Sequence, residues 1–307
     1  MRVRPNRAWL LMVGLVLALG AFNGSAEGVE GVTISDGERM AVDGWTRHKV
    51  TSPFLGRATC VDVLLPDPLK PGHKYPVLCV LPVGGEWDAQ PPWGNGLAEM
   101  RKLDAANKYQ MICVSMEFDT VPWYGSHATN PLIRHDQYLM QVVVPMVESR
   151  YPASAKPEDR WLFGFSKSGW GAVSLLLRHG DFFGRACSWD APLFEGLTSM
   201  RFDMDKHYGT LEQVASYVPA NCAKTEAKKF QGGPVRLSIL GSDFFDPDGK
   251  RYHELLKELS IPHHFDNTLR YRHHWHTGWV AKALEIMLQN DAGAKQNDNK
   301  QHRKEKP

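Results

Sequence analysis

The sequence has almost no excess charge of either sign, and this narrows the range of partners. Its 36 lysine and arginine residues nearly balance 34 aspartate and glutamate residues, which leaves a formal net charge of +2 over 307 residues. A chain with this balance lacks the basic surface that binds nucleic acid or an anionic membrane. We therefore expect neither nucleic acid nor a membrane surface as a partner.

Cysteine is scarce, and its pattern argues against a metal site. The five cysteines are an odd number, so at least one is unpaired or intermolecular. No spacing resembles a zinc site, and no metal or other cofactor is predicted. Cys79 and Cys113 lie in apolar runs typical of buried strands, where cysteine behaves as a small hydrophobic residue. A disulfide between Cys187 and Cys222 is possible in an oxidising compartment.

The apolar run at the N-terminus, Trp9–Phe22, is shorter than the roughly 20 residues that a membrane-spanning helix needs. Three arginines precede it, and Gly24-Ser25-Ala26 follows it as a small-residue cleavage site. This is the pattern of a signal peptide that is cleaved near Ala26. We expect residues 1–26 to be removed and the mature chain to be exported, without a lipid anchor or stable membrane insertion.

The rest of the chain has the composition of one large globular domain. The full sequence of 307 residues is 43% hydrophobic and 23% charged, and it contains no internal repeats. We assign residues 27–50 to a lead-in and residues 51–290 to an α/β domain. The basic, polar residues 291–307 predict a disordered tail.

Strands and helices alternate along this domain. Strands are predicted at Thr59–Leu65, Val77–Leu81, Met111–Met116, Trp161–Gly164, Arg185–Trp189, Val235–Leu240 and His263–Leu269. Helices are expected up to about Lys108, over Asp136–Arg150, after Ser166, over Lys250–Leu259 and over Gly278–Gln289. This order predicts a mostly parallel central sheet with helices on both faces. Residues 193–233 interrupt the order and are interpreted as a cap inserted over the site, with a long connection as the alternative.

The stretch Arg160–Ala172 contains the most informative pattern. An apolar run breaks at Gly164 and resumes as a helix rich in small residues. A tight turn from strand to helix would expose the hydroxyl of Ser166 above the sheet and leave backbone N–H groups for an oxyanion. The pattern predicts a nucleophile elbow and acyl-transfer chemistry, with a structural serine as the alternative. Ser168 is a second candidate nucleophile, but Trp170 would then stand where a small residue is needed.

An acid and a histidine follow later strands in the order that a serine triad requires. Ser166, Asp243 and the histidines after Leu269 all follow predicted strands, so they should meet at the carboxyl edge of the sheet. A neutral imidazole must accept the serine proton, and a carboxylate must fix the tautomer of that imidazole. The sequence therefore predicts a triad of Ser166, Asp243 and either His273 or His274.

Some of these positions have alternatives. Asp243 could instead cap the next helix, with Asp246 as the acid. Counting from the preceding strand favours His273, counting back from the terminal helix favours His274, and His276 lies too close to that helix. Three imidazoles within four residues could also bind a metal, but no acidic or cysteine partners lie nearby in the sequence.

From about Ser52 to Gln289 the chain resembles an esterase family of α/β-hydrolases that includes S-formylglutathione hydrolases, feruloyl esterases and mycolyltransferases. The matching segments are Tyr75–Leu78, Val142–Val147 with the following Tyr-Pro pair, and Gly164–Ala172. The last segment is similar to the family pattern G-x-S-x-G-G-x-G-A.

The resemblance implies an α/β-hydrolase fold with Ser166 as the nucleophile, Asp243 as the acid and His273 or His274 as the base. Ser168 departs from the family, which usually has glycine there, and a small side chain is needed because the helix packs close to the elbow strand.

A second departure lies at Pro82-Val83-Gly84-Gly85, where the family tends to have histidine and several glycines. This loop still offers backbone N–H groups, from Val83 and Gly84 onward, that could join the N–H of Lys167 in an oxyanion hole.

The predicted function is that of an exported serine esterase acting on small-molecule or polysaccharide esters, such as acylated carbohydrates, through an acyl-enzyme and without a cofactor. Tryptophans in or next to the predicted loops would suit a sugar or aromatic acyl group: Trp87, Trp93, Trp123, Trp170 and Trp275. An acyltransferase or peptidase on the same site, or a non-catalytic glycan- or protein-binding descendant of the fold, is the alternative.

Overall fold

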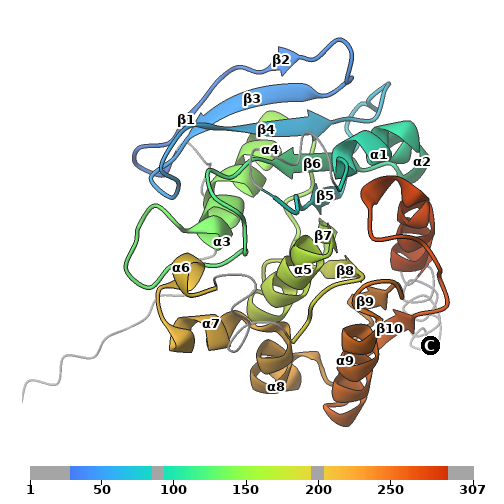
Figure 1. Cartoon of the computed structure of the whole chain (residues 1–307). Coiled ribbons are helices and arrows are strands. Elements are labelled where there is room, and N and C mark those ends of the chain that lie inside the picture. The colour runs from blue at the N-terminus through green and yellow to red at the C-terminus, as the bar shows by residue number, and fades with distance from the viewer. Residues whose placement is uncertain (1–27, 85–92, 195–203, 290–307) are drawn as a thin grey trace, which may run out of the picture.

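The structure is a computed structural model that describes residues 28–84, 93–194 and 204–289 (Figure 1). The predicted signal peptide and the predicted basic tail lie outside the described residues. Within the described part of the chain, no helix is both long and apolar enough to cross a membrane.

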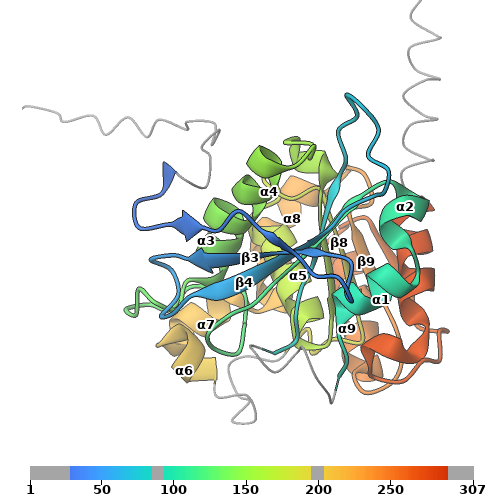
Figure 2. The same cartoon turned by 90° about the horizontal axis from the view of Figure 1, so that it is seen from above.

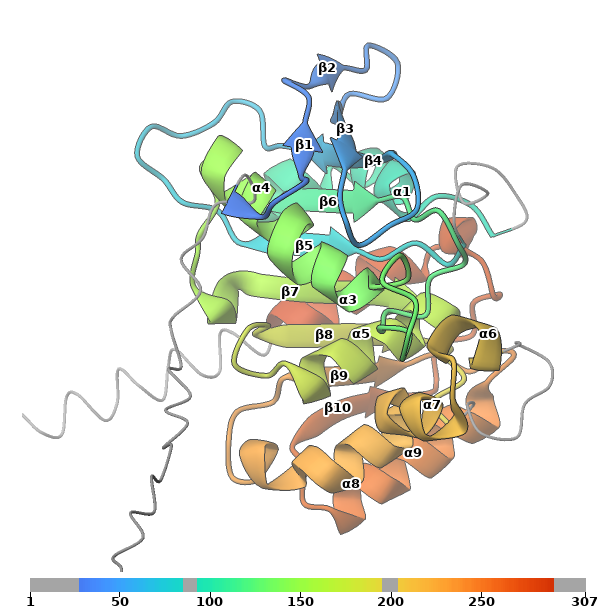
Figure 3. The same ribbon diagram turned by 90° about the vertical axis from the view of Figure 1, so that its left-hand side faces the viewer.

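One mixed sheet runs through the domain, and Figure 3 shows its strands edge to edge. Their order is β1 (Thr33–Ile34), β3 (Thr46–Thr51), β4 (Thr59–Leu64), β6 (Ile112–Met116), β5 (Val77–Val80), β7 (Arg160–Phe165), β8 (Arg185–Trp189), β9 (Leu237–Leu240) and β10 (His263–Asp266), with β2 (Glu38–Arg39) beside β3. All neighbours from β6 to β10 are parallel, and β1 to β4 pair antiparallel. The prediction of a mostly parallel sheet is confirmed.

Helices cover both faces of this sheet (Figures 1 and 2). One core lies under α3 (His135–Tyr138), α4 (Val144–Arg150), α5 (Lys167–Arg178), α7 (Leu211–Tyr217), α8 (Pro219–Phe230) and α9 (Asp246–Glu258). The other lies under α1 (Gly96–Lys102), α2 (Ala105–Tyr109) and a helix over residues 279–289. α6 (Met204–Tyr208) precedes α7, and short 3-10 turns cover Pro157–Asp159 and Trp275–Thr277.

The buried strands supply both cores because their side chains alternate. In β7, Leu162 packs into the core under α5, whereas Trp161 and Phe163 pack into the core under α1. Successive side chains of a strand point to opposite faces, so a strand covered on both sides is apolar throughout. This explains why the continuous apolar runs predicted these strands correctly.

The helix predicted over Asp136–Arg150 is present but not regular. A π-helical turn at Leu139–Val143 joins α3 to α4, and Pro145 lies at the start of α4. Proline has no N–H for the helical ladder, and a wide π turn takes up that mismatch. The apolar face predicted for this segment is buried, as Leu139 and Met146 illustrate.

Residues assigned to the lead-in, 27–50, contribute strands to the sheet. β3 (Thr46–Thr51) pairs antiparallel with β4 and extends the sheet outward. Its sequence alternates weakly and exposes several polar side chains, which hid the strand from a search for apolar runs. The antiparallel strand β4 is therefore an inner strand and not an edge.

The five cysteines are free thiols in the structure, so the possible bridge between Cys187 and Cys222 is not formed. Cys79 in β5 and Cys113 in β6 are fully buried, as predicted for small hydrophobic residues. Burial raises the pKa of both thiols to about 12, which keeps them protonated and unreactive at neutral pH.

The predicted cap at residues 193–233 is described only in part, because residues 195–203 lie outside the described residues. In α6 the hydroxyl of Tyr208 donates to the carbonyl of Trp123 at 2.5 Å, and the Ser174 hydroxyl of α5 donates to the carbonyl of Tyr217 at 2.6 Å. The described part of this segment thus packs against α5 and a neighbouring loop. Its role as a cap stays a prediction.

Candidate active site

Ser166 stands alone between the end of β7 and the start of α5, in a backbone conformation that side chains rarely adopt. Its φ is 56° and its ψ is −126°. Gly164 makes this sharp turn possible, because a Cβ atom there would lie 2.2 Å from the carbonyl oxygen of Ser168. Such strain costs about 1–3 kcal/mol and is concentrated at functional sites. The predicted strand, turn and helix are all present at the predicted residues.

Ser168 has a structural place in the same turn. Its side chain is fully buried, and its hydroxyl donates to the carbonyl of Phe165 at 2.9 Å and accepts the N–H of Phe165 at 3.0 Å. The hydroxyl thereby ties the first turn of α5 to the last residue of β7. This accounts for a serine at a position where the resemblance leads one to expect glycine.

Substituting Ser168 by alanine should therefore lower stability and spare the site. The change leaves a buried backbone N–H without its hydroxyl acceptor, at a cost of about 1–3 kcal/mol. Urea unfolding should show that the variant has a lower free energy of unfolding. Fluorophosphonate labelling should still reach one probe molecule per folded chain. A variant that unfolds normally but no longer labels would make Ser168 the nucleophile.

His273 lies directly opposite Ser166. Its Nε2 atom is 2.9 Å from the Ser166 Oγ atom, which is hydrogen-bonding distance. The ring packs against Phe165, with ring centroids 4.5 Å apart, and meets Trp93 edge-on at 5.3 Å. These contacts from two separate segments hold the imidazole in the orientation that lets it accept the serine proton. Of the two predicted histidines, His273 is the one that the structure brings to Ser166.

Asp190 completes the arrangement, and the sequence did not single it out for this place. It follows the last residue of β8, and its Oδ2 atom is 2.6 Å from Nδ1 of His273. The same carboxylate accepts N–H groups of Asp243, Phe244 and Phe245, at 3.3, 2.9 and 2.8 Å. The signal that could have found Asp190 is its position directly after a strand next to β7.

The electrostatics of Asp190 favour its ionised form. Burial alone would raise the pKa of this carboxyl, but the hydrogen bond from His273 and the backbone N–H groups of Phe245 and Phe244 outweigh it, and the pKa is lowered. A carboxylate that accepts several N–H bonds stays charged well into acid. The pair therefore presents a charged acceptor to Nδ1 of His273 and leaves Nε2 free to accept a proton.

The structure does not place Asp243 on the imidazole, which corrects the prediction of its role. Its side chain is exposed, and its Oδ2 atom accepts the backbone N–H of His273 at 2.6 Å. The loop after β9 instead points its N–H groups toward Asp190. Asp243 therefore contacts the backbone, and not the ring, of His273, in the loop of residues 267–278 that we call the histidine loop. The alternative acid, Asp246, pairs with Lys250 at 2.6 Å.

The two remaining histidines of the cluster have other partners. Nδ1 of His274 accepts the N–H of His276 at 3.1 Å, and Nδ1 of His276 lies 2.5 Å from the carboxylate of Glu99 in α1. The cluster thus divides its three imidazoles between different contacts. His276 thus connects the histidine loop to α1. The backbone N–H of Trp275 adds a second contact, to the carbonyl of Trp93 just before α1, at 2.9 Å.

A pocket of about 190 Å³ opens beside Ser166, and we call it the Ser166 pocket. It is lined by Val83, Trp93, Trp123, Ser166, Lys167, Pro192, Phe244, Phe245 and His273. Two of the predicted oxyanion residues, Val83 and Lys167, thus border the nucleophile, and Gly84 follows Val83 in the same loop. Of the predicted rim tryptophans, Trp93 and Trp123 line this pocket, Trp170 and Trp275 are buried in the cores, and Trp87 lies outside the described residues.

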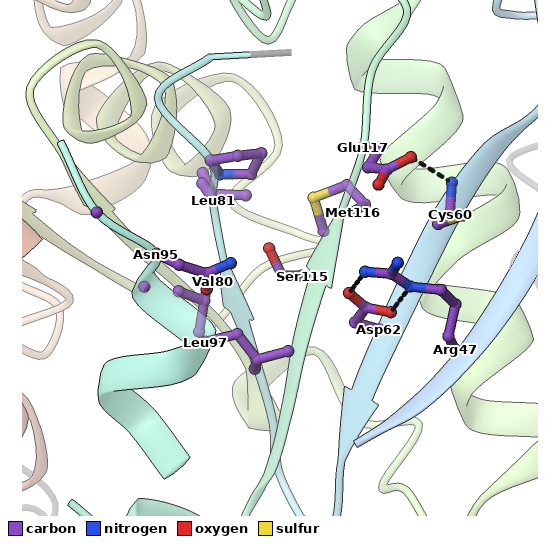
Figure 4. A pocket seen from close by; sticks show the side chains of 13 residues that line it. Arg47, Cys60, Asp62, Val80, Leu81, Asn95, Leu97, Ser115, Met116 and Glu117 are labelled. Atoms are coloured by element: carbon purple, nitrogen blue, oxygen red, sulfur yellow. Dashed lines mark hydrogen bonds and ion pairs between the residues drawn. The ribbon is translucent and has the colours of Figure 1, made fainter. Parts of the chain in front are cut away.

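A smaller, polar hollow of about 40 Å³ is lined by side chains from β3, β4, β5 and β6 and from the start of α1 (Figure 4). Arg47 makes two hydrogen bonds to Asp62, at 2.8 and 2.7 Å, and Glu117 accepts the N–H of Cys60 at 3.1 Å. The hydrogen bond to Asp62 raises the pKa of Arg47, which holds the pair charged. Because Arg47 pairs with Asp62 and Glu117 binds a backbone N–H, these charged groups already have partners. We therefore look for the catalytic residues in the Ser166 pocket and not in this hollow.

The chain is similar to known esterases in part of its sequence and in its fold. Residues 52–200, which include the elbow and Asp190, match the protein family described as "Putative esterase". Over this segment the chain is similar to that esterase family. The esterase is thus a serine hydrolase of the carboxylic-ester class. The match ends before the residues around His273, so the histidine loop is described by the structure and not by the family match.

Solved structures share the fold of this esterase at low sequence identity. A ferulic acid esterase superposes with a TM-score of 0.58 at 16% identity, covering 85% of this chain and 97% of its own. An S-formylglutathione hydrolase from Agrobacterium tumefaciens gives 0.64 at 15% identity, with 84% and 99% covered. FphF, a fluorophosphonate-binding serine hydrolase from Staphylococcus aureus, gives 0.62 at 18% identity, with 83% and 99% covered. These likenesses show the α/β-hydrolase fold. No curated protein matches the sequence.

Proposed function

We propose that the chain is an exported serine esterase whose nucleophile is Ser166, whose general base is His273 and whose acid is Asp190. The observation that carries this proposal is the continuous pair of short contacts, 2.9 Å from Ser166 to His273 and 2.6 Å from His273 to Asp190. The strained backbone of Ser166 and the lowered pKa of Asp190 support the same roles.

The geometry allows each step of ester cleavage. The Oγ atom of Ser166 attacks the ester carbonyl while Nε2 of His273 takes its proton, and Asp190 stabilises the resulting imidazolium. The N–H groups of Lys167 and of the Val83–Gly84 loop, at the positive end of α5, would receive the oxyanion. His273 then gives the proton to the leaving alcohol, and water cleaves the acyl-enzyme by the same route in reverse.

The lining of the Ser166 pocket favours an ester with a flat or apolar group. Trp93 and Phe244 are partly exposed at this pocket, and Trp123 and Phe245 complete an aromatic wall. Aromatic faces bind sugar rings and aromatic acyl groups well. Acylated carbohydrates and related esters are therefore the proposed substrates, and the N-terminal leader pattern supports export.

Labelling with a fluorophosphonate, followed by a screen of acetyl, feruloyl and longer acyl esters, tests the proposal. The purified mature chain should bind one probe molecule on Ser166 and release 4-nitrophenol from a 4-nitrophenyl ester with an initial burst. Binding of a glycan with neither labelling nor ester turnover would overturn the proposal in favour of a non-catalytic binding protein.

A further inference from the structure

The side chain of Tyr124 contacts the loop that is proposed to receive the oxyanion. The hydroxyl of Tyr124 donates a buried hydrogen bond to the backbone carbonyl of Pro82. Pro82 directly precedes Val83, which lines the Ser166 pocket together with the nucleophile. The hydroxyl therefore holds the peptide unit that links Pro82 to a residue of the pocket lining.

This hydrogen bond sets the direction of the Val83 N–H group. The carbonyl of Pro82 and the N–H of Val83 belong to one peptide unit, which is planar. Among the residues that the structure describes, the only cis peptide bond precedes Pro68, so this unit is trans and its C=O and N–H point in opposite directions. Tyr124 belongs to the core under α5 and binds the carbonyl on that side, so the N–H points away from that core.

The ring of Tyr124 has little freedom to move. It is fully buried, and it meets the ring of Phe118 edge-on with centroids 5.6 Å apart. A Cβ atom at Gly171 in α5 would lie 2.1 Å from the Tyr124 ring, so the ring packs directly against the helix backbone. The φ of Tyr124 is 53°, which is uncommon for a bulky side chain and persists only where the surroundings hold it.

Two tyrosines of the predicted cap hold the backbone on either side of Tyr124. The hydroxyl of Tyr208 in α6 donates to the carbonyl of Trp123 at 2.5 Å. The hydroxyl of Tyr217 in α7 accepts the N–H of Ser126 at 3.1 Å. The described part of the segment 193–233 thus fixes the turn that carries Tyr124.

We propose that Tyr124 is a positioning residue for ester cleavage: its hydroxyl orients the peptide between Pro82 and Val83 so that the Val83 N–H faces the oxyanion formed at Ser166. This inference rests on the proposed esterase function and adds a residue to its machinery. A donor that is oriented before the reaction stabilises the charge of the transition state without reorganisation. Loss of the orientation therefore lowers the rate of the chemical step.

Tyr124→Phe removes the hydroxyl and keeps the ring, and a pair of esters reports on the oxyanion. The pair is 4-nitrophenyl acetate and its thiono analogue, in which sulfur replaces the carbonyl oxygen and accepts hydrogen bonds more weakly. In the variant, kcat/KM for the acetate should fall about 10- to 100-fold, somewhat less than when an oxyanion donor is removed outright. The ratio of kcat/KM for the acetate to kcat/KM for the thiono ester should fall about 3- to 10-fold, because the misplaced donor no longer favours oxygen.

Tyr252→Phe is the matched control. Tyr252 in α9 is also fully buried, and its hydroxyl also donates to a proline carbonyl, that of Pro219 in α8, at 3.1 Å. Both substitutions remove a buried hydroxyl from a carbonyl, so urea unfolding should show comparable losses of stability. The control should keep the wild-type ratio of the two esters.

The ratio does not depend on how much of the enzyme is folded, so a destabilised Tyr124→Phe still gives a result. Tyr208→Phe is a second variant, because it frees the Trp123 carbonyl next to Tyr124, and it should lower the ratio by a smaller factor. If Tyr124→Phe does not fold, Tyr208→Phe decides.

The outcomes separate this inference from the function on which it rests. An equal loss of kcat/KM for both esters, with the wild-type ratio kept in every folded variant of Tyr124 and Tyr208, would make the hydroxyl merely structural and would overturn the inference. The esterase function would then stand. A wild type that neither reacts with a fluorophosphonate nor cleaves either ester would overturn the esterase function itself.

Discussion

Substituting Ser166 by alanine should reduce kcat for a 4-nitrophenyl ester by about 10⁴- to 10⁶-fold, the range seen when the nucleophile of a serine triad is removed. The Oγ atom of Ser166 lies 2.9 Å from Nε2 of His273, and alanine offers nothing for the imidazole to activate. Fluorophosphonate labelling should disappear with the activity. Steady-state kinetics with single-turnover experiments would measure the loss.

The loss should come from chemistry and not from unfolding. Alanine and serine are similar in size, and the unusual φ of 56° is imposed by the surrounding turn, so the free energy of unfolding should change by less than about 1 kcal/mol. Ser168→Ala gives the matched control, since it should lose stability and keep labelling. Retention of even a hundredth of the wild-type kcat by Ser166→Ala would point to another nucleophile.

The local features of this site could be predicted from sequence because they depend on near neighbours. The elbow requires a glycine before the serine and small residues after it, and Gly164 and Gly169 both lie where a Cβ atom would collide with a neighbouring element. Apolar runs such as Val77–Val80 predicted the buried strands for a similar reason. Burial on both faces of a sheet leaves a clear pattern in the sequence.

The acid could not be chosen in this way. Both Asp190 and Asp243 directly follow a parallel strand or its turn, and the sequence does not show how the two loops cross. β8 is the immediate neighbour of β7, so a side chain at its end lies close to Ser166. In the structure the N–H groups of residues 243–245 turn toward Asp190, which leaves Asp190 and not Asp243 beside His273. Such a path depends on tertiary packing and not on local pattern.

The sequence could not distinguish His273 from His274 for a related reason. The loop after β10 has no regular structure, and a shift of one residue exchanges the two imidazoles. Packing of the His273 ring against Phe165 and Trp93 fixes the register, and neither residue is near in sequence.

Substituting Asp190 by asparagine should lower kcat by on the order of 10³- to 10⁴-fold, whereas Asp243→Asn should change it by less than about 3-fold. The carboxylate of Asp190 accepts four N–H groups, and an amide has one oxygen. If that oxygen keeps the N–H groups of Asp243 and Phe245, the amide nitrogen faces Nδ1 of His273. The imidazole must then carry its proton on Nε2, where it can no longer accept the proton of Ser166.

The same substitution should destabilise the protein at neutral pH by about 1–3 kcal/mol, because at least one backbone N–H loses its acceptor. The pKa of Asp190 is lower in the folded protein than in the unfolded chain, where an aspartate has a pKa of about 3.9. The Asp190 carboxylate therefore stabilises the fold fully above that pH, and this stabilisation is lost as the pH falls through the lower pKa of the folded state. The difference in unfolding free energy between wild type and Asp190→Asn should therefore hold from pH 7 to about 5 and shrink below about 4.

Asp243→Asn is the control that separates the two acids. Its side-chain oxygen can still accept the N–H of His273, so the histidine loop should stay in place. Parallel measurement of kcat and of urea unfolding for both variants decides between them. A large loss of kcat in Asp243→Asn with near-normal activity in Asp190→Asn would show that Asp243, after β9, is the acid, as the chain order first suggested. The carboxylate of Asp190 would then serve only to fold the loop of residues 243–245 against the end of β8.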